Sequence, residues 1–121
     1  MTPFGQRLRE LRRERGISLK RMASDIGVSS AYLSALEHGH RGRPTFMLVQ
    51  HICAYFNIIW DEAEELQRLA ELSHPRVVID TSGMNPKATR LANRLAEAIG
   101  ALPDGALDEL AEVLRRHGLR E

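Results

Sequence analysis

The stretch from Ser18 to Gly39 constrains the fold of this chain more than any other part of the sequence. Its first half repeats apolar side chains at spacings of three and four residues, which is the pattern of one face of an α-helix. These side chains are Leu19, Met22, Ala23 and Ile26. Gly27 comes next, and glycine readily takes the left-handed backbone conformation that ends many helices. Because Ser29 can cap a second helix, with Leu33 and Leu36 on its inner face, the sequence predicts two short helices joined by a tight turn.

Two short helices joined by a glycine-containing turn form a helix-turn-helix unit. The residues here resemble the Cro- and lambda-repressor-like family of such proteins, also called XRE-type. The matching positions are Ala23, Gly27, Val28, Ser29, Leu33, Leu36, Glu37 and Gly39. Upstream, Leu8–Ser18 is similar to the first helix of the family and the turn that follows it. The resemblance covers about the first 70 residues and implies DNA binding, whereas the alternative is a helical hairpin that only packs.

Helical periodicity dominates the chain, which predicts an all-α protein. The resemblance implies that residues 1–73 form a five-helix, lambda-repressor-like DNA-binding domain. Residues 74–121 are expected to form a C-terminal tail that contains one short strand and a hairpin of two helices. The strand is expected at Arg76–Thr81, where β-branched residues cluster.

Composition and cysteine content narrow the class of protein. Hydrophobic residues make up 43% and charged residues 27% of the 121 residues, which suits either one compact domain or one small domain with an appendage. The single cysteine, Cys53, excludes an internal disulfide framework and a cysteine metal cluster. No apolar run is long enough to span a membrane, and no secretory signal follows Met1. We therefore expect a bacterial cytoplasmic protein with no membrane association.

Catalytic and metal-binding patterns are missing from the sequence. It shows no paired carboxylates, no nucleophile with a neighbouring base and no glycine-rich phosphate loop, so we expect no enzyme activity and no cofactor. His38 and His40 lie close together, but they lack carboxylate or cysteine partners at metal-binding spacing. We therefore expect no metal site.

Charge is distributed unevenly along the chain. The formal net charge is only +1, but residues 1–43 carry nine basic against four acidic side chains. Residues 44–79 carry two basic against five acidic side chains, and residues 80–121 six against seven. Positive charge therefore accompanies the helix-turn-helix stretch, as expected for a surface that contacts phosphates.

By the resemblance, the recognition helix runs from about Ser30 to His38 and enters the major groove. The residues expected to read bases are Ser30, Ala31, Tyr32, Ser34 and Ala35. None of them is arginine, asparagine or glutamine, which make the strongest bidentate contacts with base edges. Direct readout is therefore expected to be weak, with DNA shape supplying part of the specificity. The alternative for Tyr32 is a ring partly buried against the preceding helix.

Phosphate contacts are expected from both sides of the recognition helix. The residues concerned are Ser29, Lys20, Arg21, His38, His40, Arg41 and Arg43. The family usually has a phosphate-contacting glutamine where this chain has Leu19, so one anchor is replaced by an apolar side chain. The resemblance also implies that Glu37 pairs with Arg12 and ties the recognition helix to the first helix.

The tail is expected to hold two copies of the chain together. The expected strand has no partner in its own chain, and its backbone groups need pairing. Symmetric pairing with the strand of a second copy, supported by the two tail helices, would provide it. The residues expected at this interface are Val77, Val78, Ile79, Leu91, Leu95, Ile99, Leu107, Leu110 and Leu114. The alternative is an extended linker, with the tail helices folded back on the preceding helix.

These observations favour a homodimeric, sequence-specific DNA-binding transcription regulator, such as a repressor, whose partner is double-stranded DNA. Two other functions remain open at this stage. One is an antitoxin-type autorepressor that binds a protein toxin through its tail. The other is a protein-interaction adaptor that has kept the fold but lost DNA binding, which the small side chains of the recognition helix would suit.

Overall fold

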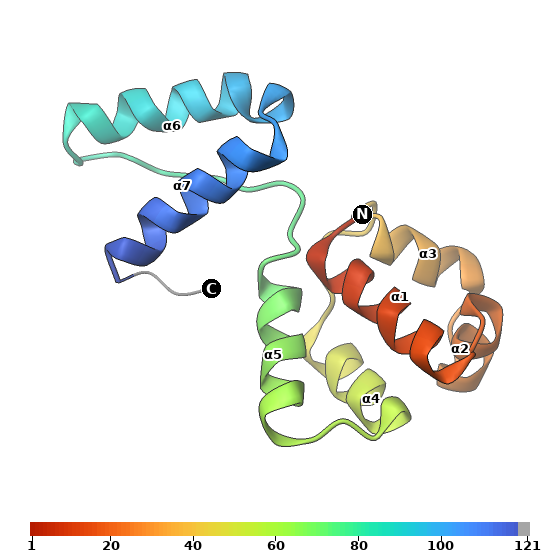
Figure 1. Ribbon diagram of the computed structural model, residues 1–121. Coiled ribbons are helices and arrows are strands. Elements are labelled where there is room, and N and C mark those ends of the chain that lie inside the picture. Colours follow the sequence, from red (N-terminus) through yellow and green to blue (C-terminus); the bar gives the residue numbers. More distant parts are fainter. Residues whose placement is uncertain (119–121) are drawn as a thin grey trace. The chain divides into compact units, whose positions relative to one another are not determined.

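Helices supply all the regular secondary structure of residues 1–118, which are the residues that this computed structural model describes. That part of the chain contains seven α-helices, one short 3₁₀ helix and no strand (Figure 1). The prediction of an all-α protein is therefore confirmed. The chain divides into two units, one spanning Met1–Val77 and the other beginning at Val78.

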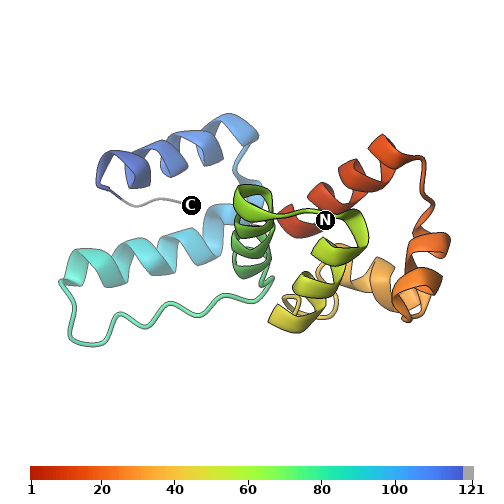
Figure 2. The same ribbon diagram turned by 90° about the horizontal axis from the view of Figure 1, so that it is seen from below.

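The first unit contains five helices, which Figure 1 and Figure 2 show from two directions. They are α1 (Pro3–Arg15), α2 (Leu19–Ile26), α3 (Ser30–Glu37), α4 (Phe46–Phe56) and α5 (Trp60–Glu71). Hydroxyl side chains cap the first four helices by accepting a hydrogen bond from a backbone N–H three residues later. The caps are Thr2, Ser18, Ser29 and Thr45. Gly27 ends α2 in the left-handed conformation, at φ 81°, as the sequence pattern predicts.

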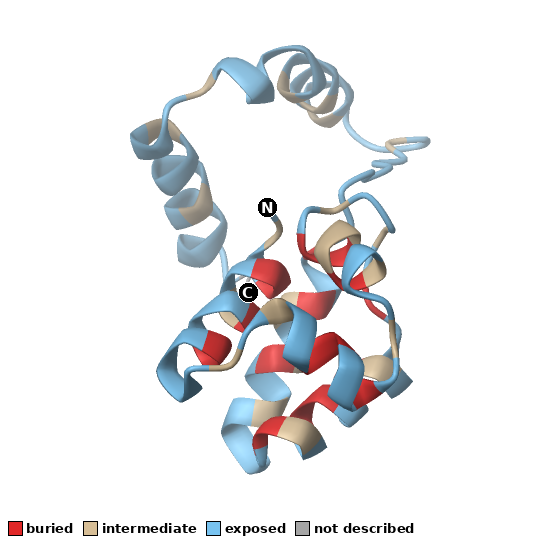
Figure 3. Cartoon of the chain, turned by 90° about the vertical axis from the view of Figure 1, so that its right-hand side faces the viewer, coloured by how far each residue is buried: buried red, intermediate tan, exposed pale blue. Residues whose placement is uncertain are grey.

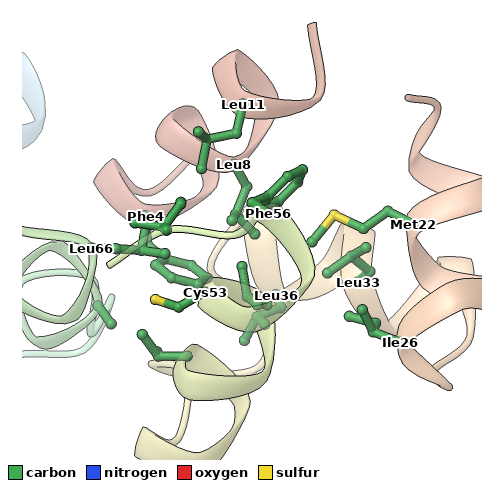
Figure 4. Packing of buried hydrophobic residues seen from close by; sticks show 14 of the residues in the cluster. Phe4, Leu8, Leu11, Met22, Ile26, Leu33, Leu36, Cys53, Phe56 and Leu66 are labelled. Atoms are coloured by element: carbon green, nitrogen blue, oxygen red, sulfur yellow. The ribbon is translucent and has the colours of Figure 1, made fainter. Parts of the chain in front are cut away.

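One hydrophobic core joins all five helices of the first unit. Side chains from every helix meet in it, and Figure 4 shows ten of them by name. The residues with the largest fully buried apolar side chains are Phe4, Leu8, Leu11, Met22, Leu33, Leu36, Val49, Ile52 and Leu66. Ala23 is also buried, and its small side chain allows α2 and α3 to approach closely. The core thus fixes α3 on the scaffold by its inner face.

The start of α1 is attached to the end of α3 and the end of α5. The backbone N–H of Thr2 donates to the carbonyl oxygen of Glu37 at 2.9 Å. The backbone N–H of Phe4 donates to the hydroxyl oxygen of Ser73, also at 2.9 Å, and Ser73 is buried. Gly5 lies so close to α3 that an added Cβ would stand 2.2 Å from the Glu37 carbonyl oxygen.

The second unit has helices but no buried residue in its described part. It contains α6 (Pro86–Ala98), the 3₁₀ helix η1 (Ile99–Ala101) and α7 (Asp104–Arg116). Asn85 caps α6 by accepting from the N–H of Lys87 at 2.8 Å. In Figure 3 the buried residues lie in the first unit, and α6 and α7 carry only exposed and half-buried ones. Apolar stripes on both helices therefore remain accessible.

The strand expected at residues 76–81 does not form within this chain. Residues 77–81 have no regular secondary structure, and within residues 1–118 no segment forms a ladder with them. A strand exists only when its backbone groups pair with a neighbour, and a single copy supplies none. The expected strand is therefore not confirmed by the structure of a single copy.

The close approach at Gly5 yields a test of the core. We expect Gly5→Ala to lower the free energy of unfolding by about 1–3 kcal/mol, because the new methyl group overlaps the backbone of α3. Gly105→Ala is the matched control, since Gly105 also lies near the start of a helix but nothing stands within 4 Å of its added Cβ. Urea unfolding followed by circular dichroism measures both. Equal stability of the two variants would contradict the close packing of α1 on α3.

Candidate nucleic-acid interface

Helix α3 is half inside the core and half accessible. Its inner face buries Leu33, Leu36 and Glu37. On the outer side, Ser30 and Ala31 are exposed at its first turn, and the capping residue Ser29 is exposed as well. The other three residues predicted to read bases, Tyr32, Ser34 and Ala35, are half-buried. The most accessible part of the predicted reading face is therefore the N-terminal turn of α3.

Ser29 combines two capabilities at that turn. Its hydroxyl oxygen accepts a hydrogen bond from the backbone N–H of Tyr32 at 3.0 Å, which caps α3. The hydroxyl proton remains available to donate to an external acceptor, because a serine hydroxyl is both a donor and an acceptor. The helix N-terminus also carries partial positive charge. An anionic oxygen is therefore favoured beside Ser29.

The loop from His38 to Pro44 packs its start against α3. The ring Nδ1 of His38 lies 2.8 Å from the carbonyl oxygen of Ser34. The backbone N–H of His40 donates to the carbonyl oxygen of Ala35 at 2.8 Å. Gly39 takes φ 83°, which bends the chain away from the helix axis. These contacts hold the two histidines at the C-terminal end of α3.

Arg41 links this loop to α3. Its guanidinium carbon lies 5.8 Å from the centre of the Tyr32 ring, within the range of a cation–π interaction. Arg41 and Arg43 are both exposed. The structure thus brings a loop arginine next to a predicted base-reading residue, a contact that no spacing in the sequence could have shown.

Arg12 and Glu37 lie together as a buried ion pair between α1 and α3. Arg12 Nη1 contacts Glu37 Oε2, and Arg12 Nη2 lies 3.2 Å from Glu37 Oε1, so the pair is bidentate. Glu37 is 1% exposed and Arg12 is 7% exposed. A bidentate guanidinium–carboxylate contact fixes relative orientation as well as distance. The pair therefore locks the C-terminal end of α3 against α1.

Lys20 and Arg21 lie exposed in the first turn of α2. Arg21 Nε lies 3.7 Å from Asp25 Oδ2, one turn further along the same helix. Asp25 in turn accepts a hydrogen bond from the hydroxyl of Tyr55 on α4 at 2.7 Å. Burial raises the pKa of Tyr55, and the bond to the Asp25 carboxylate raises it further. The pattern of the sequence did not indicate this contact, which joins α2 to α4.

Three further findings concern metal binding, the cysteine thiol and membrane crossing. No group of three or more histidine, cysteine, aspartate or glutamate side chains within residues 1–118 could hold a metal ion. Cys53 is buried, and burial raises the pKa of its thiol. Among the helices of residues 1–118, none is long and apolar enough to cross a membrane.

The predicted dimerisation residues lie on the accessible surface. Val77, Val78 and Ile79 are exposed in the segment without regular structure. Five of the six leucine and isoleucine positions on α6, η1 and α7 are exposed as well, namely Leu91, Ile99, Leu107, Leu110 and Leu114. Leu95 is half-buried.

Comparison with known proteins identifies the family. The family model described as a helix-turn-helix domain matches residues 5–72. The chain belongs to this family. The resemblance to XRE-type regulators predicted from Ala23, Gly27 and the residues that follow them is thereby confirmed.

Several curated bacterial proteins are similar to this chain. The uncharacterized HTH-type transcriptional regulator RghRB of Bacillus subtilis is 39% identical over 61 residues, which cover 50% of this chain and 44% of RghRB. The HTH-type transcriptional regulator SinR of the same species is 30% identical over 95 residues, which cover 72% of this chain and 86% of SinR. The HTH-type transcriptional repressor RghR is 46% identical over 44 residues, 36% of this chain and 33% of RghR. No solved structure matches the chain at a significant level.

These alignments differ in the share of each protein that they cover. The match to RghRB spans less than half of that protein's length. The match to SinR covers more of this chain than the first unit contains, so the similarity extends into the second unit.

The buried pair yields a prediction about stability. We expect Arg12→Met to lower the free energy of unfolding by about 3–5 kcal/mol, because it leaves the Glu37 carboxylate buried without a counterion. The double variant Arg12→Met/Glu37→Leu should recover part of this loss, since it removes the unpaired charge. Arg7→Met is the control, because Arg7 pairs with Glu10 in the solvent, and it should cost less than about 1 kcal/mol. Urea unfolding measures all three, and a single Arg12 variant as stable as the control would contradict the structural role of the pair.

Proposed function

We propose that this protein is a sequence-specific DNA-binding transcription regulator that acts as a homodimer and places α3 in the major groove. The observation that carries the proposal is the accessible N-terminal turn of α3 beside the basic loop at residues 38–43. The relatives support it, because RghRB and SinR are named as transcriptional regulators. The positive charge of residues 1–43 supports it too, since phosphate contact supplies much of the affinity of such proteins.

In this proposal, one face of α3 reads the bases. Ser30 and Ala31 are the most accessible of its residues, with Tyr32, Ser34 and Ala35 beside them. Serine can donate to or accept from any base edge, and an alanine methyl can contact the thymine methyl group. Such contacts discriminate weakly. Sequence-dependent DNA shape therefore supplies part of the specificity.

In this proposal, groups on both sides of this face bind phosphates. The proposed contacts are Ser29, Lys20, Arg21, His38, His40, Arg41 and Arg43. The Ser29 hydroxyl and the N-terminus of α3 would favour one phosphate together. The exposed arginines of the loop would follow the backbone beyond the C-terminal end of α3. Contacts of this kind position a protein on DNA without reading its sequence.

Residues 1–73 would bind DNA and residues 74–121 would hold two copies together. One helix-turn-helix unit reaches few base pairs, and two units one turn apart, about 34 Å, match a palindromic site. Helices α6 and α7 expose apolar stripes that two copies could bury against each other. The extended segment at residues 77–79 would pair with its counterpart in the second copy and gain the backbone partners it lacks alone.

The roles proposed for loop and helix predict different effects on binding. Arg41→Ala/Arg43→Ala should weaken binding to all DNA sequences alike, and should flatten the plot of log K against log salt by about 0.9 for each lost phosphate contact. Ser30→Ala should instead change the preference at one or two base pairs, by about 1–3 kcal/mol at most. Fluorescence anisotropy at several salt concentrations, on a site selected from random DNA, measures both effects.

A control for charge alone is available on α6. Arg90 and Arg94 are exposed, and helical spacing places them opposite the apolar stripe. Arg90→Gln/Arg94→Gln removes the same charge as the loop variant but should leave the salt slope unchanged. If the loop variant keeps the slope of the parent, the loop does not contact phosphates.

The tail yields a separate prediction about assembly. The full-length chain should sediment as a dimer, and a chain that ends at Val77, the boundary of the first unit, should sediment as a monomer. Leu91→Glu/Leu95→Glu should also give monomers, because it places charge in the apolar stripe of α6. A truncated chain that remains dimeric would show that another surface makes the dimer. A monomeric full-length chain would count against the homodimer and favour a different protein as the partner of the tail.

A further inference from the structure

Apart from Arg12, which is buried against Glu37, the arginines of α1 fall into two groups that the sequence does not distinguish. Arg7 lies 3.1 Å from Glu10 and 3.8 Å from Glu14. Arg15 donates to the carbonyl oxygen of Phe56 at 3.1 Å and lies over its ring. Arg9 and Arg13, in contrast, have no hydrogen bond or ion pair within residues 1–118, and both are exposed.

The two unpaired arginines share one hollow on α1. Arg9 and Arg13 line it together with Met1, Gln6 and Glu10, and its volume is about 410 Å³. Glu10 is the only acidic residue of this lining, and its carboxylate is already paired with Arg7. The hollow is therefore cationic, with an amide donor beside two guanidinium groups.

The position of this hollow relates it to α3. Gly5 and Arg12 are the residues of α1 that meet Glu37 at the end of α3. Arg9 lies four residues after Gly5 and three before Arg12, so helical geometry places it along the same edge of α1. Arg13 lies one turn beyond Arg9. The cationic hollow thus borders the contact between α1 and α3.

Local stability does not explain this pair of charges. Like charges four residues apart on a helix repel each other. Arg13 suits the C-terminal turn of α1, where the helix dipole favours cations, but Arg9 lies in the middle of the helix. An external anion that bridges both guanidinium groups would remove the repulsion. Guanidinium groups match the geometry of phosphate oxygens in particular.

We propose that Arg9 and Arg13 form a phosphate-binding edge on α1 that contacts the backbone of the same double-stranded DNA whose major groove α3 enters. The inference rests on the proposed function and extends its interface to a fourth segment of the chain, beside the start of α2, α3 and the loop at residues 38–43. Arg7 and Arg15 take no part in this edge, because each of them already contacts other groups of the protein. Contact on α1 would widen the footprint along one strand without adding sequence information.

The test compares matched pairs of arginines in the full chain on a DNA site selected by the parent protein. Arg9→Gln/Arg13→Gln should flatten the plot of log K against log salt by about 0.9 for each phosphate lost, or about 1.8 per chain. Arg9→Lys/Arg13→Lys keeps both charges and should keep most of the slope. Arg90→Gln/Arg94→Gln has the same spacing on α6 and should leave the slope at the parent value. Circular dichroism confirms that each variant is folded.

The possible results separate this inference from the function on which it rests. A parent protein that shows no salt-dependent binding to any DNA overturns both. A parent that binds its site, together with a glutamine pair that has the parent slope, overturns only the contact on α1. Equal flattening by the α6 pair also overturns it, because the effect would then reflect net charge alone. Ethylation interference provides a second readout, in which specific phosphates lose their effect only in the Arg9/Arg13 variant.

Discussion

The contact between α1 and the end of α3 organises the first unit. Three features converge on Glu37: its carboxylate pairs with Arg12, its carbonyl oxygen accepts from the N–H of Thr2, and its backbone packs on Gly5. A buried ion pair contributes little net stability, because desolvation of both charges offsets their attraction. It does impose one orientation, since any other arrangement leaves a charge buried without a partner. The direction of α3, and hence of its accessible turn, depends on this junction.

The second unit differs from the first in how far it buries its apolar side chains. The first unit buries apolar side chains from all five of its helices, whereas α6 and α7 bury none in the described part of the chain. Burial of apolar side chains is the main source of folding free energy. Two amphipathic helices without such burial therefore gain little free energy from one particular arrangement. The exposed parts of their stripes could be buried further by a surface from outside the unit. In the proposed homodimer, assembly and folding of the tail would therefore be coupled.

Local chemistry made much of the first unit predictable. Hydroxyl caps at Ser18 and Ser29 and the glycine at position 27 mark helix ends by hydrogen bonds and backbone conformation within a few residues. Several features that depend on tertiary contacts were missed. Trp60 begins α5 at φ 55°, which side chains of its size rarely adopt, and no pattern indicated it. The strand expected at residues 76–81 is not confirmed by the single chain, because one copy does not supply the partner that a strand needs.

The candidate interface also depends on tertiary contacts, so the structure refines what the sequence predicts for it. The sequence counts nine basic side chains in residues 1–43 but cannot tell which of them are already neutralised. Arg12 is buried against Glu37, and Arg7 and Arg15 are held by groups of the protein itself. A charge satisfied internally would have to break that contact before it could bind a phosphate, so it adds little to affinity. Within residues 1–43, the basic side chains without an ion-pair partner among the described residues are Arg9, Arg13, Lys20, Arg41 and Arg43. Arg21 has only an exposed contact with Asp25 at 3.7 Å, which a phosphate can displace. In the proposed complex, these side chains would surround the face of α3 that enters the major groove, because the other basic side chains of residues 1–43 are held by internal contacts.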